Sequence, residues 1–235
     1  MLWQKGWLET RFRLLFTLGL AGFLLALQHS LRTSVPTPRM KAVVLGMIAF
    51  YNIVPMIMTC AMLAGAGIDT QPTFQASKGL HGSTLFTVSL PVSRFRLLAV
   101  RAAVGWLESV ATIALFCWGS WFMSPVLRVV ATSAEMAEYA VTLIACGSAL
   151  YFLSVLLATF LDDQWRTWGT MFAAGALWWI SHKDWLPASV DIVQAIGKNS
   201  PLIAHTMPWT AMVFSVILAA VFFVAALKIV QTREY

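Results

Sequence analysis

Six long apolar runs dominate this sequence and limit the folds that it can adopt. A helix needs about 20 apolar residues to cross roughly 30 Å of hydrocarbon, and most of these runs are about that long or longer. Each run is apolar all round, whereas the strands of a membrane barrel would alternate at every second residue. The pattern therefore predicts an all-α, polytopic membrane protein with about six transmembrane helices. The runs cover residues 14–31, 42–68, 102–122, 139–161, 167–181 and 209–227.

The fifth run, 167–181, is the shortest of the six. By length alone it suits a re-entrant segment as well as a span. Trp165 and Trp185 flank it, and Trp side chains favour the membrane interface. These two residues favour a full but tightly anchored span.

The composition also indicates a membrane protein. Hydrophobic residues make up 59% of the chain and charged residues only 11%, whereas soluble domains carry about 25% charged residues. The formal charge of +6 comes largely from basic residues that flank the apolar runs, so it reports topology rather than nucleic-acid binding. We expect one transmembrane domain, 1–235, that contacts lipid and no nucleic acid.

Lys and Arg residues predict the orientation, because they are enriched in cytoplasmic loops. If the first residues lie inside, the inner segments hold ten of the 16 Lys and Arg residues and the outer segments hold six. We therefore expect both termini in the cytoplasm, in a bacterial cytoplasmic (inner) membrane. Arg39 and Lys41 are the main exceptions to this orientation.

Two further stretches lie outside the runs. On a helix, Trp3 and Trp7 of the leader 1–13 share a face, and charged residues take the opposite face. This pattern predicts an amphipathic helix at the inner membrane surface. The outer stretch 182–208 is rich in Pro and reads as a loop or re-entrant segment, within which 190–196 can form a short helix.

The inner loop between the second and third runs, 71–96, has an ordered pattern that we call the coupling loop. Gly breaks the chain, a Ser or Thr can cap a short helix over 85–90, and Pro91 ends that helix because proline lacks an N–H. Ser93 can cap the next helix, which Arg94, Arg96 and Arg101 would anchor at the headgroups. The alternative is an ordinary interfacial turn. The residues that carry the pattern are Gly82, Ser83, Thr84, Leu85, Phe86, Leu90, Pro91, Ser93 and Arg94.

The same loop resembles the ABC-2 type transporter permease family. It reads Gly-Ser-Thr-Leu at 82–85 and Ser-Leu-Pro-Val-Ser-Arg at 89–94, followed by Leu-Leu at 97–98 and a basic residue at 101. The six runs, the leader and the outer Ser-Pro-Leu at 200–202 extend the resemblance to nearly the whole chain. Family members often place an acidic residue just before the Gly-Thr-Leu, where this chain has Ser77, Lys78 and His81.

The resemblance implies a permease subunit that exports a substrate. The coupling loop would then dock on a separate cytoplasmic ATP-binding subunit, and two permease subunits, identical or similar, would form the pathway. The chain has no G-x-x-x-x-G-K-[ST] phosphate loop, so ATP and Mg would be held by the partner. We therefore expect no enzymatic activity and no cofactor on this chain.

Two other readings stay open. A membrane redox subunit would use His residues to hold haem or a metal, although all four His residues lie at run ends or in loops. A non-transporting immunity or scaffold protein would need no ordered inner loop. Cys60, Cys117 and Cys146 share no short spacing, so we expect packing residues rather than a zinc or disulfide framework.

Glu108 is the one carboxylate well inside a predicted span. An intramembrane acid costs several kcal/mol unless it is paired or hydrated, and it marks a functional candidate. We expect a polar contact between subunits in preference to substrate binding.

Overall fold

The structure, a computed structural model, describes residues 2–30, 52–64, 93–161, 163–183 and 185–232. Within these ranges every regular element is a helix and there is no strand, which confirms the all-α prediction. Most of the coupling loop, from 71 to 92, lies outside the described residues. The elements are α1 (Leu2–Ser30), a helix over Asn52–Leu63, α4 (Arg94–Met123), α5 (Pro125–Val130), α6 (Ser133–Leu157), α7 (Asp163–His182), α8 (Ile192–Ile196), α9 (Pro201–Ala204) and α10 (Trp209–Thr232).

Four of these helices are long and apolar enough to cross a membrane, and they confirm the membrane character of the chain. These four helices, α1, α4, α6 and α10, match the first, third, fourth and sixth apolar runs. The helix Asn52–Leu63 is the described part of the second run, and α7 covers the fifth run without being among the four. The four membrane segments are Thr10–Leu27, Phe95–Met123, Ser133–Leu157 and Trp209–Thr232.

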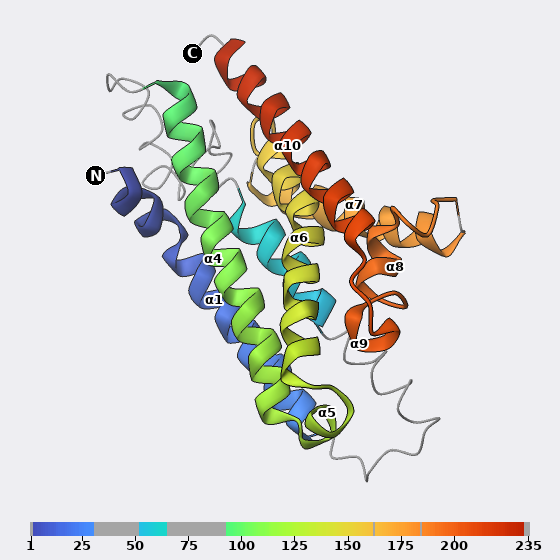
Figure 1. Ribbon diagram of the computed structural model, residues 1–235. Helices are drawn as coiled ribbons and strands as arrows, with labels where there is room; N and C mark the ends of the chain where they lie inside the picture. The colour runs from blue at the N-terminus through green and yellow to red at the C-terminus, as the bar shows by residue number, and fades with distance from the viewer. Residues whose placement is uncertain (1, 31–51, 65–92, 162, 184, 233–235) are drawn as a thin grey trace.

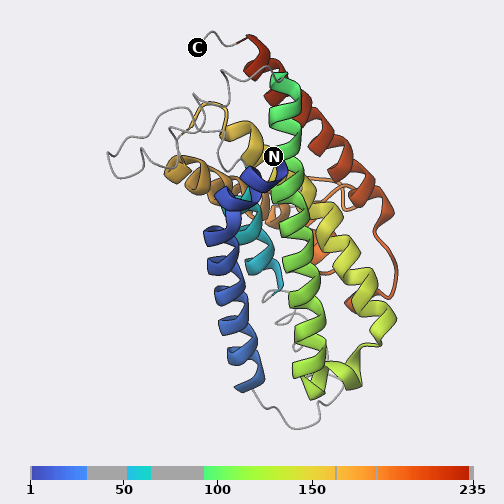
Figure 2. The same ribbon diagram turned by 90° about the vertical axis from the view of Figure 1, so that its left-hand side faces the viewer.

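The leader forms the first turns of α1 and is continuous with the first apolar segment. These turns run at an angle to the rest of the helix (Figure 2). Trp3 and Trp7 are about half exposed, whereas Thr10 and Thr17 are buried. The face of α1 that contains the two threonines therefore packs inside the bundle.

Helix α6 lies at the centre of the bundle and contacts α4, α7, α8, α9 and α10 (Figure 1). Its interior face is made largely of small or aromatic residues, such as Cys146, Gly147 and Tyr151. The sulfhydryl of Cys60 lies 3.5 Å from the carbonyl oxygen of Gly147, and a Cβ on Gly147 would lie 3.2 Å from Met56. The glycine therefore lets the helix Asn52–Leu63 approach α6 closely.

Helices α1 and α4 lie side by side and run in the same direction (Figures 1 and 2). Thr10, in the first half of α1, contacts Glu108, halfway along α4. Leu25 and Gly119, which lie near the ends of the two helices, pack against each other. After the short α5, helix α6 runs back in the opposite direction.

Helices α6 and α10 also run in the same direction. Thr142 of α6 contacts Met212 of α10, and ten residues further along α6 the ring of Phe152 meets that of Phe223 at 5.6 Å. The chain must therefore return along the whole of α6 before α10 begins. Helices α7, α8 and α9 make this return together, and it ends at His205, which reaches Glu135 in the first turn of α6.

The outer stretch 182–208 contains the short helices α8 and α9, both packed on α6. Asp191 caps α8, because its side chain accepts hydrogen bonds from the backbone N–H groups of Val193 and Gln194. Asp191, Ile196 and Leu202 are buried. The stretch is therefore folded onto the bundle, and α8 falls within the short helix expected over 190–196.

Candidate functional site

The coupling loop enters α4 through Ser93. The Ser93 hydroxyl accepts a hydrogen bond of 3.3 Å from the backbone N–H of Arg96, so Ser93 is the N-cap that the sequence predicted. Arg94 is the first residue of the helix. The other predicted coupling residues lie outside the described residues: Gly82, Ser83, Thr84, Leu85, Phe86, Leu90 and Pro91.

The basic residues at this end of α4 do not all behave as anchors. Arg96 is exposed, as a headgroup anchor should be, but Arg101 is only 7% exposed. Arg101 lies on the same face as Leu98, Ala102 and Gly105, which is the face that α4 turns toward the bundle. The expectation that Arg101 reaches the headgroups is therefore wrong, because helical periodicity directs this side chain inward.

Glu108 lies halfway along α4 and is 7% exposed. The Thr10 hydroxyl of α1 donates a hydrogen bond of 2.5 Å to its Oε1. The other carboxylate oxygen, Oε2, is buried and has no hydrogen-bond partner in the described part of the chain. The structure thus gives Glu108 a partner within the same chain, Thr10, and leaves its second carboxylate oxygen without a hydrogen bond.

The other polar side chains near Glu108 on α4 satisfy themselves. Ser109 and Thr112 each donate a hydrogen bond of 2.8 Å to the carbonyl oxygen four residues earlier, a common arrangement for hydroxyl groups in apolar helices. Glu108 has no such local solution, because a carboxylate can only accept hydrogen bonds.

A groove of about 440 Å³ lies between α1 and α4, and we call it the α1–α4 groove. Glu108 is among the residues that line it, but its Oε2 atom is buried. Trp3 and Trp7, which the sequence predicts to share a face of the leader, line the groove together with Leu14 and Leu18. This face of α1 is therefore turned toward α4. The α4 side of the groove is formed by Val104, Leu107, Glu108, Ala111, Thr112 and Leu115.

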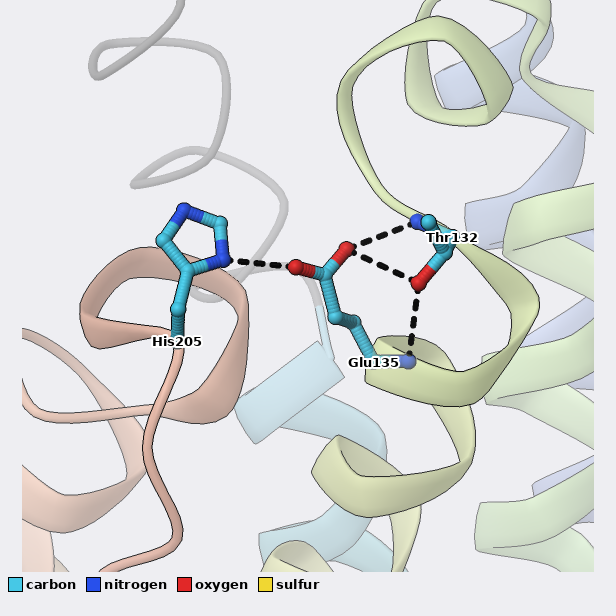
Figure 3. A network of polar contacts seen from close by, with 3 residues as sticks. All are labelled: Thr132, Glu135 and His205. Atoms are coloured by element: carbon cyan, nitrogen blue, oxygen red, sulfur yellow. Dashed lines mark hydrogen bonds and ion pairs between the residues drawn. The ribbon is translucent and has the colours of Figure 1, made fainter.

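A second polar cluster lies at the first turn of α6 (Figure 3). Thr132 and Glu135 form a capping box: the Glu135 carboxylate accepts a hydrogen bond of 2.8 Å from the backbone N–H of Thr132, and the Thr132 hydroxyl accepts one from the backbone N–H of Glu135. The Nδ1 atom of His205 lies 2.6 Å from the other Glu135 oxygen. This contact ties the end of the α7–α9 return to the first turn of α6.

The described His and Cys residues are spread through the fold. His182 stacks on Trp178, with ring centroids 4.4 Å apart, and is far in sequence from the His205–Glu135 contact. Within the described ranges no group of three or more His, Cys, Asp or Glu side chains could hold a metal. Cys60, Cys117 and Cys146 are free and buried, and so act as packing residues.

Two features of the site could not be read from the sequence. Thr10 is separated from Glu108 by 98 positions, and no spacing rule connects residues on different helices. Arg166, one of the ten Lys and Arg residues counted on the predicted inner side, is completely buried at the start of α7.

Comparisons of this chain with protein-family models, with curated proteins and with solved structures gave no match.

Proposed function

We propose that this chain is a permease subunit of an ABC transporter, which exports a substrate by using ATP hydrolysed on a separate cytoplasmic subunit. One observation carries the proposal. Helix α4 is a single, uninterrupted helix of 30 residues that begins at Arg94, in the last residues of the coupling loop, and carries Glu108. A displacement applied at Ser93 would therefore reach the buried carboxylate through continuous helix.

The geometry of α4 suits such transmission. Glu108 lies about 21 Å along the helix from Arg94, at 1.5 Å per residue. The α4 sequence from 94 to 123 contains no Pro, and proline is a main cause of sharp kinks. The N-cap at Ser93 fixes the first turn, so a partner that binds the coupling loop would move a defined helix end. Flexible chain at this joint would absorb that movement instead.

The proposal includes six passes through the membrane. Helices α1 and α4 run one way, and α6 and α10 run the other. The helix Asn52–Leu63 supplies part of a pass between α1 and α4, and the α7–α9 return supplies one between α6 and α10. An even number of passes puts the first turns of α1 and the last turns of α10 on one side, which the proposal assigns to the cytoplasm.

The proposal also includes a second permease subunit, identical to this chain or similar to it. A substrate pathway needs walls on all sides, and exporters of this kind are expected to form it between two subunits. Broad apolar surfaces of α10 are exposed, including Val213, Ile217 and Val224. Such surfaces must be covered either by lipid or by another helix.

Purification of the chain from its native membrane tests the proposal. An ATPase that carries a phosphate loop should copurify in stoichiometric amount, and crosslinking in the membrane should give a permease dimer. The complex should hydrolyse ATP, and replacement of the phosphate-loop Lys in the ATPase should stop the hydrolysis. A complex that contains no ATPase chain would overturn the proposal.

A further inference from the structure

We propose that the α1–α4 groove binds one acyl chain of a membrane phospholipid, whose phosphate lies beside Arg11. The lipid belongs to the leaflet that meets the first turns of α1 and α4. This is a claim about binding by the chain itself and holds whether or not the chain is a transporter. It rests on the dimensions of the groove, the chemistry of its walls and the position of one exposed cation.

The length of the groove matches that of a lipid chain. Its α1 wall runs from Trp7 to Leu18 and its α4 wall from Val104 to Leu115. Each of these stretches is about 17 Å long at the helical rise per residue. The hydrocarbon of one leaflet is about 15 Å deep, which is half of the bilayer core. The two helices run side by side in the same direction, so together they bracket a channel one leaflet deep.

The groove is too narrow for a protein helix. A volume of about 440 Å³ spread over this length leaves a mean cross-section of about 26 Å². An α-helix with its side chains is about 10 Å across, which corresponds to a cross-section of about 80 Å². Apolar atoms in contact lie about 4 Å apart, so a channel about 5 Å wide suits a hydrocarbon chain. A helix from a second copy of this chain is therefore a poor fit.

The walls of the groove suit hydrocarbon and exclude water. The surface that they present is almost wholly apolar. The Thr112 hydroxyl donates to the backbone carbonyl of Glu108, whose carboxylate accepts from Thr10 through one oxygen and buries the other. A confined water needs about two to four polar partners, which these walls do not offer. Leu107 and Leu115 are 58% and 63% exposed, so the groove is open to the acyl chains of the bilayer.

An exposed cation borders the groove. Trp7 and Leu14 line the groove from one face of α1, and Arg11 occupies the position between them on that face. Arg11 is exposed, and its Cζ atom lies 4.7 Å from the centroid of the Phe12 ring. A guanidinium group binds phosphate oxygens through paired hydrogen bonds. The charge of Arg11 is therefore complementary to the phosphate of a lipid whose chain lies in the groove.

The level of Arg11 also matches that of lipid headgroups. The apolar segment of α1 begins at the adjacent Thr10, and Arg side chains reach from such positions to the membrane surface. Trp7 and Trp3, one and two turns before Arg11, are about half exposed, and Trp favours the interface. A phosphate beside Arg11 thus places the acyl chain along the groove.

The first test uses a phosphatidylcholine with a photoreactive diazirine halfway along one acyl chain, in nanodiscs that contain the chain. Mass spectrometry then locates the labelled residues. Leu107 and Leu115 should be labelled several times as strongly as Val213 and Ile217 of α10, which are exposed to a similar degree but lie outside the groove. Equal labelling would mean ordinary contact with bulk lipid and would overturn the proposal.

A groove-filling variant tests the same site. Ala111→Phe adds a ring on the exposed side of the α4 wall and should lower the labelling of Leu107 to the wild-type level of α10. The matched control, Ala220→Phe, adds the same ring at an exposed position of α10 and should leave the labelling of Leu107 unchanged. Undiminished labelling in Ala111→Phe would overturn the proposal. The wild-type comparison decides the matter alone if Ala111→Phe fails to fold.

The last test concerns the phosphate and the alternative occupant. After detergent exchange, native mass spectrometry should find a phospholipid retained on the wild type and on Arg128→Gln, which removes an exposed cation in α5. Retention should fall several-fold in Arg11→Gln, and equal retention in the two variants would overturn the role of Arg11. Disulfide formation between two copies of Leu107→Cys would assign the groove to a second copy of this chain and overturn the choice of a lipid.

Discussion

Tyr151 of α6 donates a hydrogen bond of 2.8 Å to the carbonyl oxygen of Ala102 in α4. One turn further along α4, a Cβ on Gly105 would lie 2.5 Å from both the Tyr151 hydroxyl oxygen and the carbonyl oxygen of Leu63. Three helices therefore meet at this point, and the missing side chain of Gly105 is the reason that they can. The ring of Trp106 packs against Tyr151 at 5.2 Å and helps to hold it.

Gly105→Ala should destabilise the bundle, because the added methyl group would overlap a backbone oxygen that cannot move aside. Overpacking of this kind costs about 1–3 kcal/mol. Thermal unfolding in detergent would measure the effect as a lower Tm. The control is Gly22→Ala in α1, where nothing lies within 4 Å of the added Cβ and the Tm should stay the same or rise slightly. Equal behaviour of the two variants would contradict the close packing at Gly105.

Thr10 and Glu108 should be energetically coupled across α1 and α4. Thr10→Val removes the donor and leaves the carboxylate with no partner, which should cost about 1–2 kcal/mol. In the Glu108→Leu background the same change should cost little, because no acceptor remains. Glu108→Gln should have a small effect on stability, since its amide oxygen still accepts from Thr10. The double-mutant cycle, measured by unfolding in SDS, isolates this interaction, and additive costs would show that the contact carries no energy.

The capping box at α6 should matter more than the ion pair beside it. Glu135→Ala removes the hydrogen bonds that the carboxylate accepts from Thr132, together with the contact to His205. The bond from the backbone N–H of residue 135 to the Thr132 hydroxyl remains, so the loss of the side-chain half of the capping box should cost about 1 kcal/mol. His205→Ala removes only a partly exposed pair, which is worth about 0–1 kcal/mol. Hydrogen exchange at the first turn of α6 should therefore rise more in Glu135→Ala than in His205→Ala. The reverse order would mean that His205, rather than the cap, holds this turn in place.

The directions of the helices predict which residues share a side of the membrane. Arg96 at the start of α4 and Thr232 at the end of α10 should face the cytoplasm, and Arg128 in α5 should face outward. All three are exposed, so each can be replaced by Cys and labelled with an impermeant maleimide in intact cells. The three native Cys residues are buried and would be changed to Ala. Labelling of 128 alone is expected, and labelling of 96 or 232 without 128 would contradict the orientation.

The helical fold could be predicted because a membrane makes strong demands on sequence. A run such as 139–161, with no charged residue, has few alternatives to a helix in lipid. The contacts between helices could not be predicted, because they depend on which faces meet. Arg101 shows the difference. Its position near the end of α4 suggested that it reaches the lipid headgroups, yet it lies on the face of α4 that is buried in the bundle. The meeting of Thr10 with Glu108 likewise follows from the parallel packing of α1 and α4, which no local pattern encodes.

The coupling loop contains the residues on which the proposed function depends most. Leu85 and Phe86 are apolar residues in the loop that the proposal places on the cytoplasmic side, and we expect them to enter a groove on the ATPase. Truncation of such an anchor typically costs more than about 1 kcal/mol at an interface. Neither residue lies in an expected span, so their replacement should leave membrane insertion intact. Pro91→Ala should have a milder effect, because the helix over 85–90 could then fuse with α4.

The most direct measurement of the central claim is ATPase pull-down and coupled hydrolysis in reconstituted membranes for Phe86→Ala and Leu85→Asp. Phe122→Ala, which truncates an exposed aromatic residue in the last turn of α4, at the opposite end from the coupling loop, is the matched control. The account predicts weakened ATPase binding, or hydrolysis uncoupled from transport, in the two loop variants and wild-type behaviour in the control. Wild-type binding and coupling in both loop variants would contradict it.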